Sequence, residues 1–262
     1  MYYLNLTKGF VMYTIKIFAY IIFLLKIGLF AYSLNSQLNT IKICTAGGFI
    51  PFTYFENGYW QGFDIDMMTD FSKSQNKKIE IINYNIDGII PALIAKKCEL
   101  ISSGLVVTEN RKKSVQFSTG YFKSSIILLY RKDNKIIEKI SNNEELNQSK
   151  YRIGVKIGTT NDFYAAKHLS QVTLLKFNEY GDLVNSVRNK KVDAILIDST
   201  YGKYLNKKFP GIFLFKNNKD TEQSFGVAFR KDDNELLTLF EKFFLHWKET
   251  GKYKRTYDKY FE

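Results

Sequence analysis

The sequence has few of the residues that bind metal ions or form covalent cross-links. Its 262 residues include two histidines and two cysteines. His168 and His246 lie far apart on stretches with helical patterning, so no spacing typical of a metal site is present. The motifs of a nucleophile elbow, a phosphate-binding loop and a GxGxxG turn are also missing. These absences predict neither a metal nor a bound cofactor.

Acidic residues are fewer than basic ones: the chain has 26 aspartates and glutamates and 38 lysines and arginines, which gives a formal net charge of +12. Such an excess can indicate nucleic-acid binding. However, the lysines occur singly and in pairs along the chain, without one long basic block. Diffuse charge of this kind does not favour nucleic acid. A content of 45% hydrophobic and 24% charged residues is typical of a globular protein.

No apolar run reaches the roughly 20 residues that a membrane-spanning helix needs. The longest, "IFAYIIFLL" at 17–25, follows a basic start, is interrupted by Lys26, and precedes the small residues Ala31 and Ser33. This order is typical of a signal peptide over residues 1–33 that is cleaved near Ser33. An uncleaved membrane anchor remains open, because tolerating Lys26 would extend the run to about residue 32.

Export would permit a disulfide between the two cysteines, Cys44 and Cys98. Cys44 lies inside a predicted strand at 41–47, and Cys98 lies at the start of another, at 99–104. If these strands pair in parallel, the two positions are offset along the strand direction. A bridge needs Cα atoms within about 7 Å. We therefore expect two buried thiols, with a disulfide as the alternative.

After residue 40, strand and helix patterns alternate. The first series has strands at 41–47, 78–84 and 99–104, with helices at 62–76 and 87–98 and another that opens near Arg111. The second has strands at 124–132, 151–158, 172–177 and 192–198, with helices opening at 159 and spanning 179–190. Two amphipathic helices, at 233–249 and 252–261, end the chain. This alternation predicts α/β lobes with mainly parallel sheets, and ligands in such sheets bind beyond the carboxyl ends of the strands.

Five motifs occur in order: "GGFIPFTYFENGYWQGFDIDMM", "DGIIPALIAKKCELISSGLVVTENRKKSVQFS", "GVKIGTT", "VDAILID" and "GKYKRTYDKYF". Together they resemble the periplasmic solute-binding proteins of polar amino-acid ABC importers. The resemblance implies the type II, or Venus-flytrap, fold: two lobes with mixed, mainly parallel sheets, joined by two crossover strands. Lobe 1 would hold 38–122 and 226–262, and lobe 2 would hold 126–221.

The resemblance also assigns a ligand site in the cleft. Arg111 would bind the α-carboxylate, because its planar fork of donors suits bidentate pairing, with help from the main chain of Gly104 and Val106. Thr159 and Thr160 would reach the same carboxylate from lobe 2 through free amides at a helix start. They would also suit an ordinary helix cap.

Two further residues complete the predicted site. Asp198, at the end of "VDAILID", would meet the α-ammonium, and Phe49 would cover the ligand side chain. Where relatives have a hydroxyl, an acid and an aromatic residue, this chain has Val106, Ala46 and Ile86. These departures make the pocket less polar, so we expect an amino acid with an uncharged or modestly polar side chain.

The resemblance implies a monomeric, non-enzymatic, periplasmic component of an ABC importer. It would capture an amino acid and deliver it to a permease in the inner membrane. Two alternatives remain. One is a cyclohexadienyl or arogenate dehydratase on the same fold, which needs a carboxyl group of raised pKa in the cleft. The other is a membrane-anchored ligand sensor.

Overall fold

The computed structural model describes Phe23, Lys26 and residues 39–262. The predicted signal peptide therefore lies outside the described residues except at two positions. None of the helices among these described residues combines the length and the hydropathy of a membrane span.

The first lobe is built on a five-stranded sheet in the order β4–β1–β5–β12–β6. Its strands are β1 (Thr40–Thr45), β4 (Lys78–Asn83), β5 (Leu100–Ile101), β6 (Val115–Phe117) and β12 (Ala228–Arg230). β1 pairs in parallel with β4 and β5, whereas β12 runs antiparallel to β5 and β6. The C-terminal part of the chain thus returns to the sheet that the N-terminal part begins.

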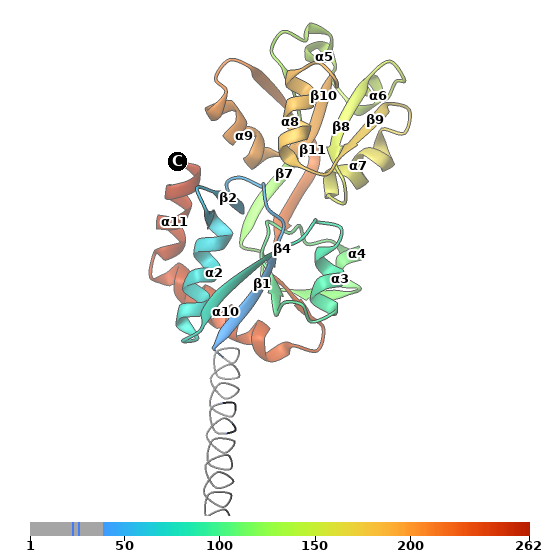
Figure 1. The fold of residues 1–262 in the computed structure, drawn as a ribbon. Helices are drawn as coiled ribbons and strands as arrows, with labels where there is room; N and C mark the ends of the chain where they lie inside the picture. Colours follow the sequence, from blue (N-terminus) through green and yellow to red (C-terminus); the bar gives the residue numbers. More distant parts are fainter. Residues whose placement is uncertain (1–22, 24–25, 27–38) are drawn as a thin grey trace, which may run out of the picture.

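Helices cover both faces of this sheet (Figure 1). One face carries α2 (Phe63–Ser74), α10 (Asn234–Glu249) and α11 (Lys252–Phe261), and the other carries α3 (Ile89–Ile94) and the short α4 (Glu109–Lys112). Alternation along β1 explains this, because Ile41 and Ile43 belong to the buried cluster of α2 and α10, whereas Cys44 belongs to that of α3. A hairpin of β2 (Tyr54–Glu56) and β3 (Tyr59–Gln61) precedes α2.

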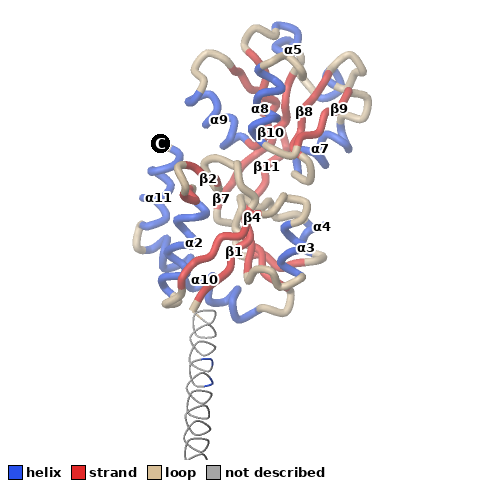
Figure 2. The backbone as a smooth tube through the Cα atoms, viewed as in Figure 1, coloured by secondary structure: helices blue, strands red, loops and turns tan. Residues whose placement is uncertain are grey.

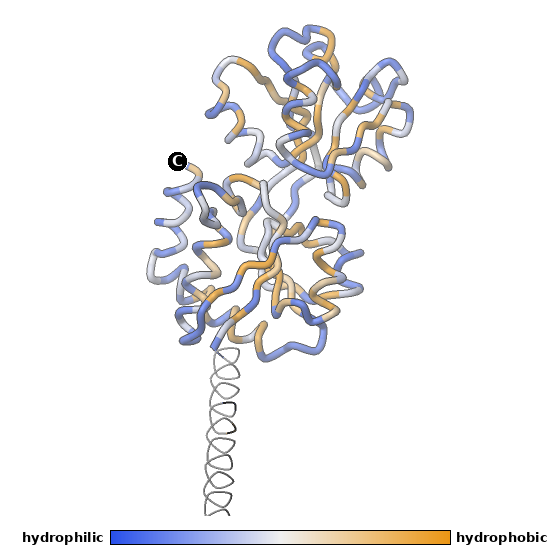
Figure 3. Tube along the Cα trace, viewed as in Figure 1, coloured by the Kyte–Doolittle hydropathy of each residue, from blue (hydrophilic) through white to orange (hydrophobic). Residues whose placement is uncertain are grey.

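The second lobe has a five-stranded sheet in the order β11–β7–β10–β8–β9. Its strands are β7 (Phe122–Arg131), β8 (Arg152–Lys156), β9 (Thr173–Phe177), β10 (Ala194–Asp198) and β11 (Phe213–Phe225). Its helices are α5 (Lys135–Lys139), α6 (Asn143–Leu146), α7 (Thr160–His168), α8 (Tyr180–Arg188) and α9 (Ser199–Lys208). Strands β8, β9 and β10 are parallel. Hydrophobic residues gather along the strands of both sheets, where the helices cover them (Figure 3).

The two long antiparallel strands, β7 and β11, run from one lobe into the other (Figure 2). Their pairing shifts register between Asn217 and Glu222, so the ladder is interrupted partway. The predicted fold class, with two α/β lobes and two crossover strands, is confirmed. The exact lobe boundaries remain predictions.

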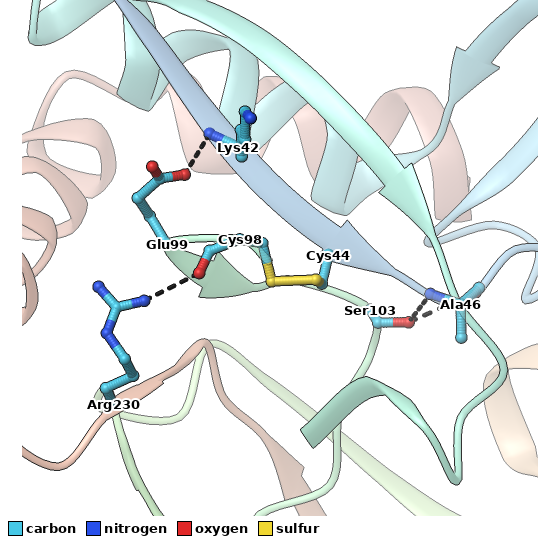
Figure 4. Close-up of a disulfide and its surroundings, with 7 residues drawn as sticks. All are labelled: Lys42, Cys44, Ala46, Cys98, Glu99, Ser103 and Arg230. Atoms are coloured by element: carbon cyan, nitrogen blue, oxygen red, sulfur yellow. Dashed lines mark hydrogen bonds between the residues drawn. A yellow bond between two sulfur atoms is a disulfide. The ribbon is translucent and has the colours of Figure 1, made fainter. Parts of the chain in front are cut away.

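The prediction of two free thiols is wrong, because Cys44 and Cys98 form a disulfide with their Cα atoms 5.7 Å apart (Figure 4). The offset argument assumed that Cys98 continues its strand. Instead β5 begins at Leu100, and Cys98 lies in the bend after α3. The strand register therefore does not set its position. Arg230 donates a 2.8 Å hydrogen bond to the Cys98 carbonyl and holds this bend to β12.

Candidate functional site

A small pocket lies between the lobes, at the carboxyl ends of their parallel strands. Its volume is about 30 Å³, room for one or two water molecules. The first lobe contributes the loops after β1, β4 and β5 together with α4. The second contributes the end of β8 with the loop after it, the starts of α7 and α8, and the end of β10. The lining residues are Ala46, Phe49, Ile86, Ser103, Gly104, Leu105, Val106, Arg111, Lys156, Thr159, Thr160, Tyr180 and Asp198. All seven residues that the sequence predicted for the site are among them.

Arg111 lies on α4, whose first turn is capped by the Thr108 hydroxyl. Its guanidinium donates to the Val106 carbonyl at 2.8 Å and, across the lobes, to the Gly158 carbonyl at 3.3 Å. Burial lowers its pKa to about 10, against the opposing effect of Asp198, so the side chain stays charged at neutral pH. Among the described residues no carboxylate lies within ion-pair distance of this cation. A buried guanidinium of this kind suits a carboxylate ligand.

Asp198 is the last residue of β10 and is 4% exposed. Its carboxylate accepts hydrogen bonds from the side-chain amides of Asn161, at 3.2 Å, and Gln223, at 2.7 Å. Burial raises the pKa of Asp198 to about 6, and the Asn161 bond and the charge of Arg111 oppose that rise. The carboxylate is thus charged at neutral pH and has neutral donors, which leaves its charge available for a ligand ammonium.

Thr159 and Thr160 open helix α7 after the tight turn at Gly158. The Thr159 hydroxyl caps the helix by accepting from the Asp162 N–H and also donates to the Lys156 carbonyl. The Thr160 hydroxyl donates to Oε1 of Gln223 at 2.9 Å. Gln223 therefore links Thr160 to Asp198 from the crossover strand β11. Neither Gln223 nor Asn161 was predicted, because each is one polar residue among many in its segment.

Phe49 makes an aromatic contact between the lobes. Its ring stacks on Tyr180, at the start of α8, with centroids 5.4 Å apart and planes 19° apart, and also on Phe52 at 5.0 Å. The loop after β5 presses against the same ring, because a Cβ on Gly104 would lie 2.4 Å from it. Gly104 also has a φ of +55°, which favours glycine. Tyr180 was not predicted, since nothing in "NEYGDL" separates it from other buried tyrosines.

Asp64 holds the loop that carries Gly104. Its Oδ2 accepts from the Gly104 N–H and the Tyr121 hydroxyl, both at 2.7 Å. The Gly104 N–H is thus already paired, so contact between a ligand and this residue would use other atoms. Asp64 is fully buried, and burial raises its pKa to about 6. This acid in the first turn of α2 therefore fixes a loop of the pocket.

Comparisons with known proteins place the chain among bacterial binding proteins. Residues 41–262 match the family model of the bacterial extracellular solute-binding proteins, family 3. A probable histidine-binding protein of Campylobacter jejuni is 28% identical over 222 residues, covering 84% of each chain. The arginine-binding extracellular protein ArtP of Bacillus subtilis is 27% identical over 223 residues, covering 83% of this chain and 84% of that one.

A solved structure of an amino acid-binding protein has a similar fold. The crystal structure of the ancestral amino acid-binding protein AncCDT-1, a precursor of cyclohexadienyl dehydratase, superposes with a TM-score of 0.80. It is 31% identical in sequence, and the match covers 86% of this chain and 97% of that one.

Proposed function

Because the chain belongs to the bacterial extracellular solute-binding proteins, family 3, we propose that it captures an α-amino acid between its lobes and delivers it to an ABC importer. One observation carries this proposal. Arg111 of the first lobe and Asp198 of the second face the same buried pocket with opposite charges, and their hydrogen-bond partners are neutral. A zwitterion offers one group to each.

The ligand would hold the lobes together. Its carboxylate replaces the carbonyl partners of Arg111, and its ammonium binds Asp198, so the closed state gains contacts that an open state lacks. That difference in affinity is what shifts a population toward closure. The pocket of about 30 Å³ is too small for an amino acid. Binding therefore requires the lobes, which touch through Arg111 with Gly158 and Phe49 with Tyr180, to move apart first.

The remaining parts of the proposal concern the cellular setting. The protein acts without chemical conversion of its ligand, as a monomer, in the periplasm, after cleavage of a signal peptide near Ser33. Its partner is the permease of the importer in the inner membrane. The names of the relatives, a probable histidine-binding protein and an arginine-binding protein, support the absence of chemical conversion.

A dehydratase is the second candidate, favoured by one observation: Asp198 is a buried cleft carboxyl whose pKa is raised to about 6. A general acid for the loss of water needs such a group. However, Asp198 already serves the ammonium in the binding proposal. Prephenate turnover, followed by the absorbance of the aromatic product, separates the two. We expect no turnover, and steady turnover that is lost in Asp198→Asn would favour the enzyme.

Binding itself is tested with the purified protein by a thermal-unfolding panel of the twenty amino acids. The best binder is then compared with its methyl ester, which lacks the carboxylate charge, and its N-acetyl form, which lacks the ammonium. A ligand present at about 100 times its dissociation constant stabilises the fold by about 2.7 kcal/mol. We expect a shift in the melting midpoint for a few amino acids and none for either derivative. Equal shifts for the derivatives would contradict recognition of a zwitterion.

A further inference from the structure

Lys156 is a second cation in the pocket. The proposed binding of a zwitterion by Arg111 and Asp198 gives it no partner. Lys156 is the last residue of β8, and only 4% of it is exposed to solvent. It lines the pocket between the lobes and also a larger cavity of about 510 Å³ beyond it, and the two share Ala46 and Lys156. A side chain that extends from the pocket toward this cavity would pass Lys156.

The ammonium of Lys156 has neutral neighbours. It donates to the main-chain carbonyl of Asn178 and lies 5.1 Å from the centre of the Tyr180 ring. Among the described residues no carboxylate is within ion-pair distance of it. Burial lowers the pKa of Lys156, against the more distant charges of Glu179 and Asp87. A buried cation without an ionic partner destabilises the protein. A ligand that carries a negative charge can pair with this cation and so gains affinity.

Lys156 lies on the side of the pocket that adjoins the larger cavity, because it lines both, whereas Arg111 and Asp198 line only the pocket. A zwitterion would occupy Arg111 and Asp198 and leave Lys156 free. The charge still to be balanced in the pocket is therefore positive.

We propose that the site selects an α-amino acid with an acidic side chain, whose second carboxylate pairs with Lys156. This inference rests on the proposed function. It departs from the uncharged or modestly polar side chain expected from Val106, Ala46 and Ile86, because no sequence pattern placed Lys156 in the cleft. It also separates this chain from the relatives that are named for arginine or histidine, since a cationic side chain would be repelled at this position.

Two near-isosteric ligand pairs test the proposal: glutamate with glutamine, and aspartate with asparagine. Calorimetric titration of the purified protein should show at least one acid binding about tenfold or more tightly than its amide, because the acid adds a charge-assisted pair. Lys156→Met keeps the length of the side chain and removes its charge, so this preference should vanish. The matched control, Lys167→Met, changes an exposed lysine of α7 and should keep it.

The outcomes separate this inference from the function on which it rests. Amides that bind as tightly as their acids, or arginine that binds more tightly than either acid, would overturn the role of Lys156 while leaving amino-acid capture intact. A preference that survives in Lys156→Met would do the same, provided its melting midpoint shows that this variant is folded. Binding of none of the twenty amino acids would overturn both.

Discussion

Opening the disulfide should destabilise the protein strongly. Cys44 and Cys98 are 54 residues apart in the sequence. In the loop-entropy description, a cross-link that closes a loop of this length removes about 14 cal/mol/K from the unfolded chain, or about 4 kcal/mol at 25 °C. That is a large part of the 5–15 kcal/mol typical of a whole domain. Because Cys44 is fully buried and Cys98 is 2% exposed, reduction should require unfolding.

Urea unfolding with and without reductant measures this effect in a chain of unchanged composition. The oxidised protein should unfold at higher urea, with a free energy of unfolding larger by about 4 kcal/mol. The double variant Cys44→Ser/Cys98→Ser should show no response to reductant. Thiol titration in denaturant should find no free thiols before reduction and two after it. Coincident transitions, or two free thiols in the untreated protein, would refute the reasoning.

Three more predictions concern charge and backbone. The affinity for a zwitterionic amino acid should fall as the pH drops through about 6, where Asp198 is protonated. Calorimetry at pH 5 and 7.5 checks this, and the affinity of Asp198→Asn should depend less on pH. Because the folded state raises the pKa of Asp64 from 3.8 to about 6, it binds this proton more tightly than the unfolded chain. The contribution of Asp64 to the free energy of unfolding should therefore grow as the pH falls from 7 to 4, toward a limit of about 3 kcal/mol. Urea unfolding of Asp64→Asn should lack this contribution. Gly104→Ala should lower the melting midpoint and weaken ligand binding, since its Cβ would meet Phe49; an unchanged midpoint would contradict the close packing.

Much of the fold follows from periodicity. The parallel strands β1, β8 and β10 are short runs with mostly buried positions, bounded by turn residues, which is the pattern that buried strands require. Helix α9 and strand β11 were not predicted. From Lys216 onward β11 reads "KNNKDTEQSF" and is mostly polar, and it is a strand because it pairs with β7 across the lobes. Pairing of this kind depends on tertiary contacts that local sequence does not encode.

Some residues of the site could likewise be predicted from the sequence, whereas others depend on tertiary contacts. Arg111 and Asp198 were predictable from the resemblance, because each is a charged residue at the carboxyl end of a strand or at the start of the next helix. Lys156 was not, since a lysine at the end of a strand is ordinarily exposed, and its burial depends on Tyr180 packing from another helix. Gln223 reaches the pocket only because β11 crosses between the lobes. The disulfide was missed because a bend, which periodicity does not locate, brings Cys98 to β1.

The most direct test of amino-acid capture between the lobes is a calorimetric titration of the best-binding amino acid against the protein and Arg111→Lys. Lysine keeps the charge but loses the planar fork of donors, so we predict an affinity lower by about a hundredfold. Arg152→Lys, which changes an arginine paired with Asp193 away from the pocket, is the matched control and should bind as the unchanged protein does. Equal affinities in all three would contradict a ligand carboxylate held by Arg111.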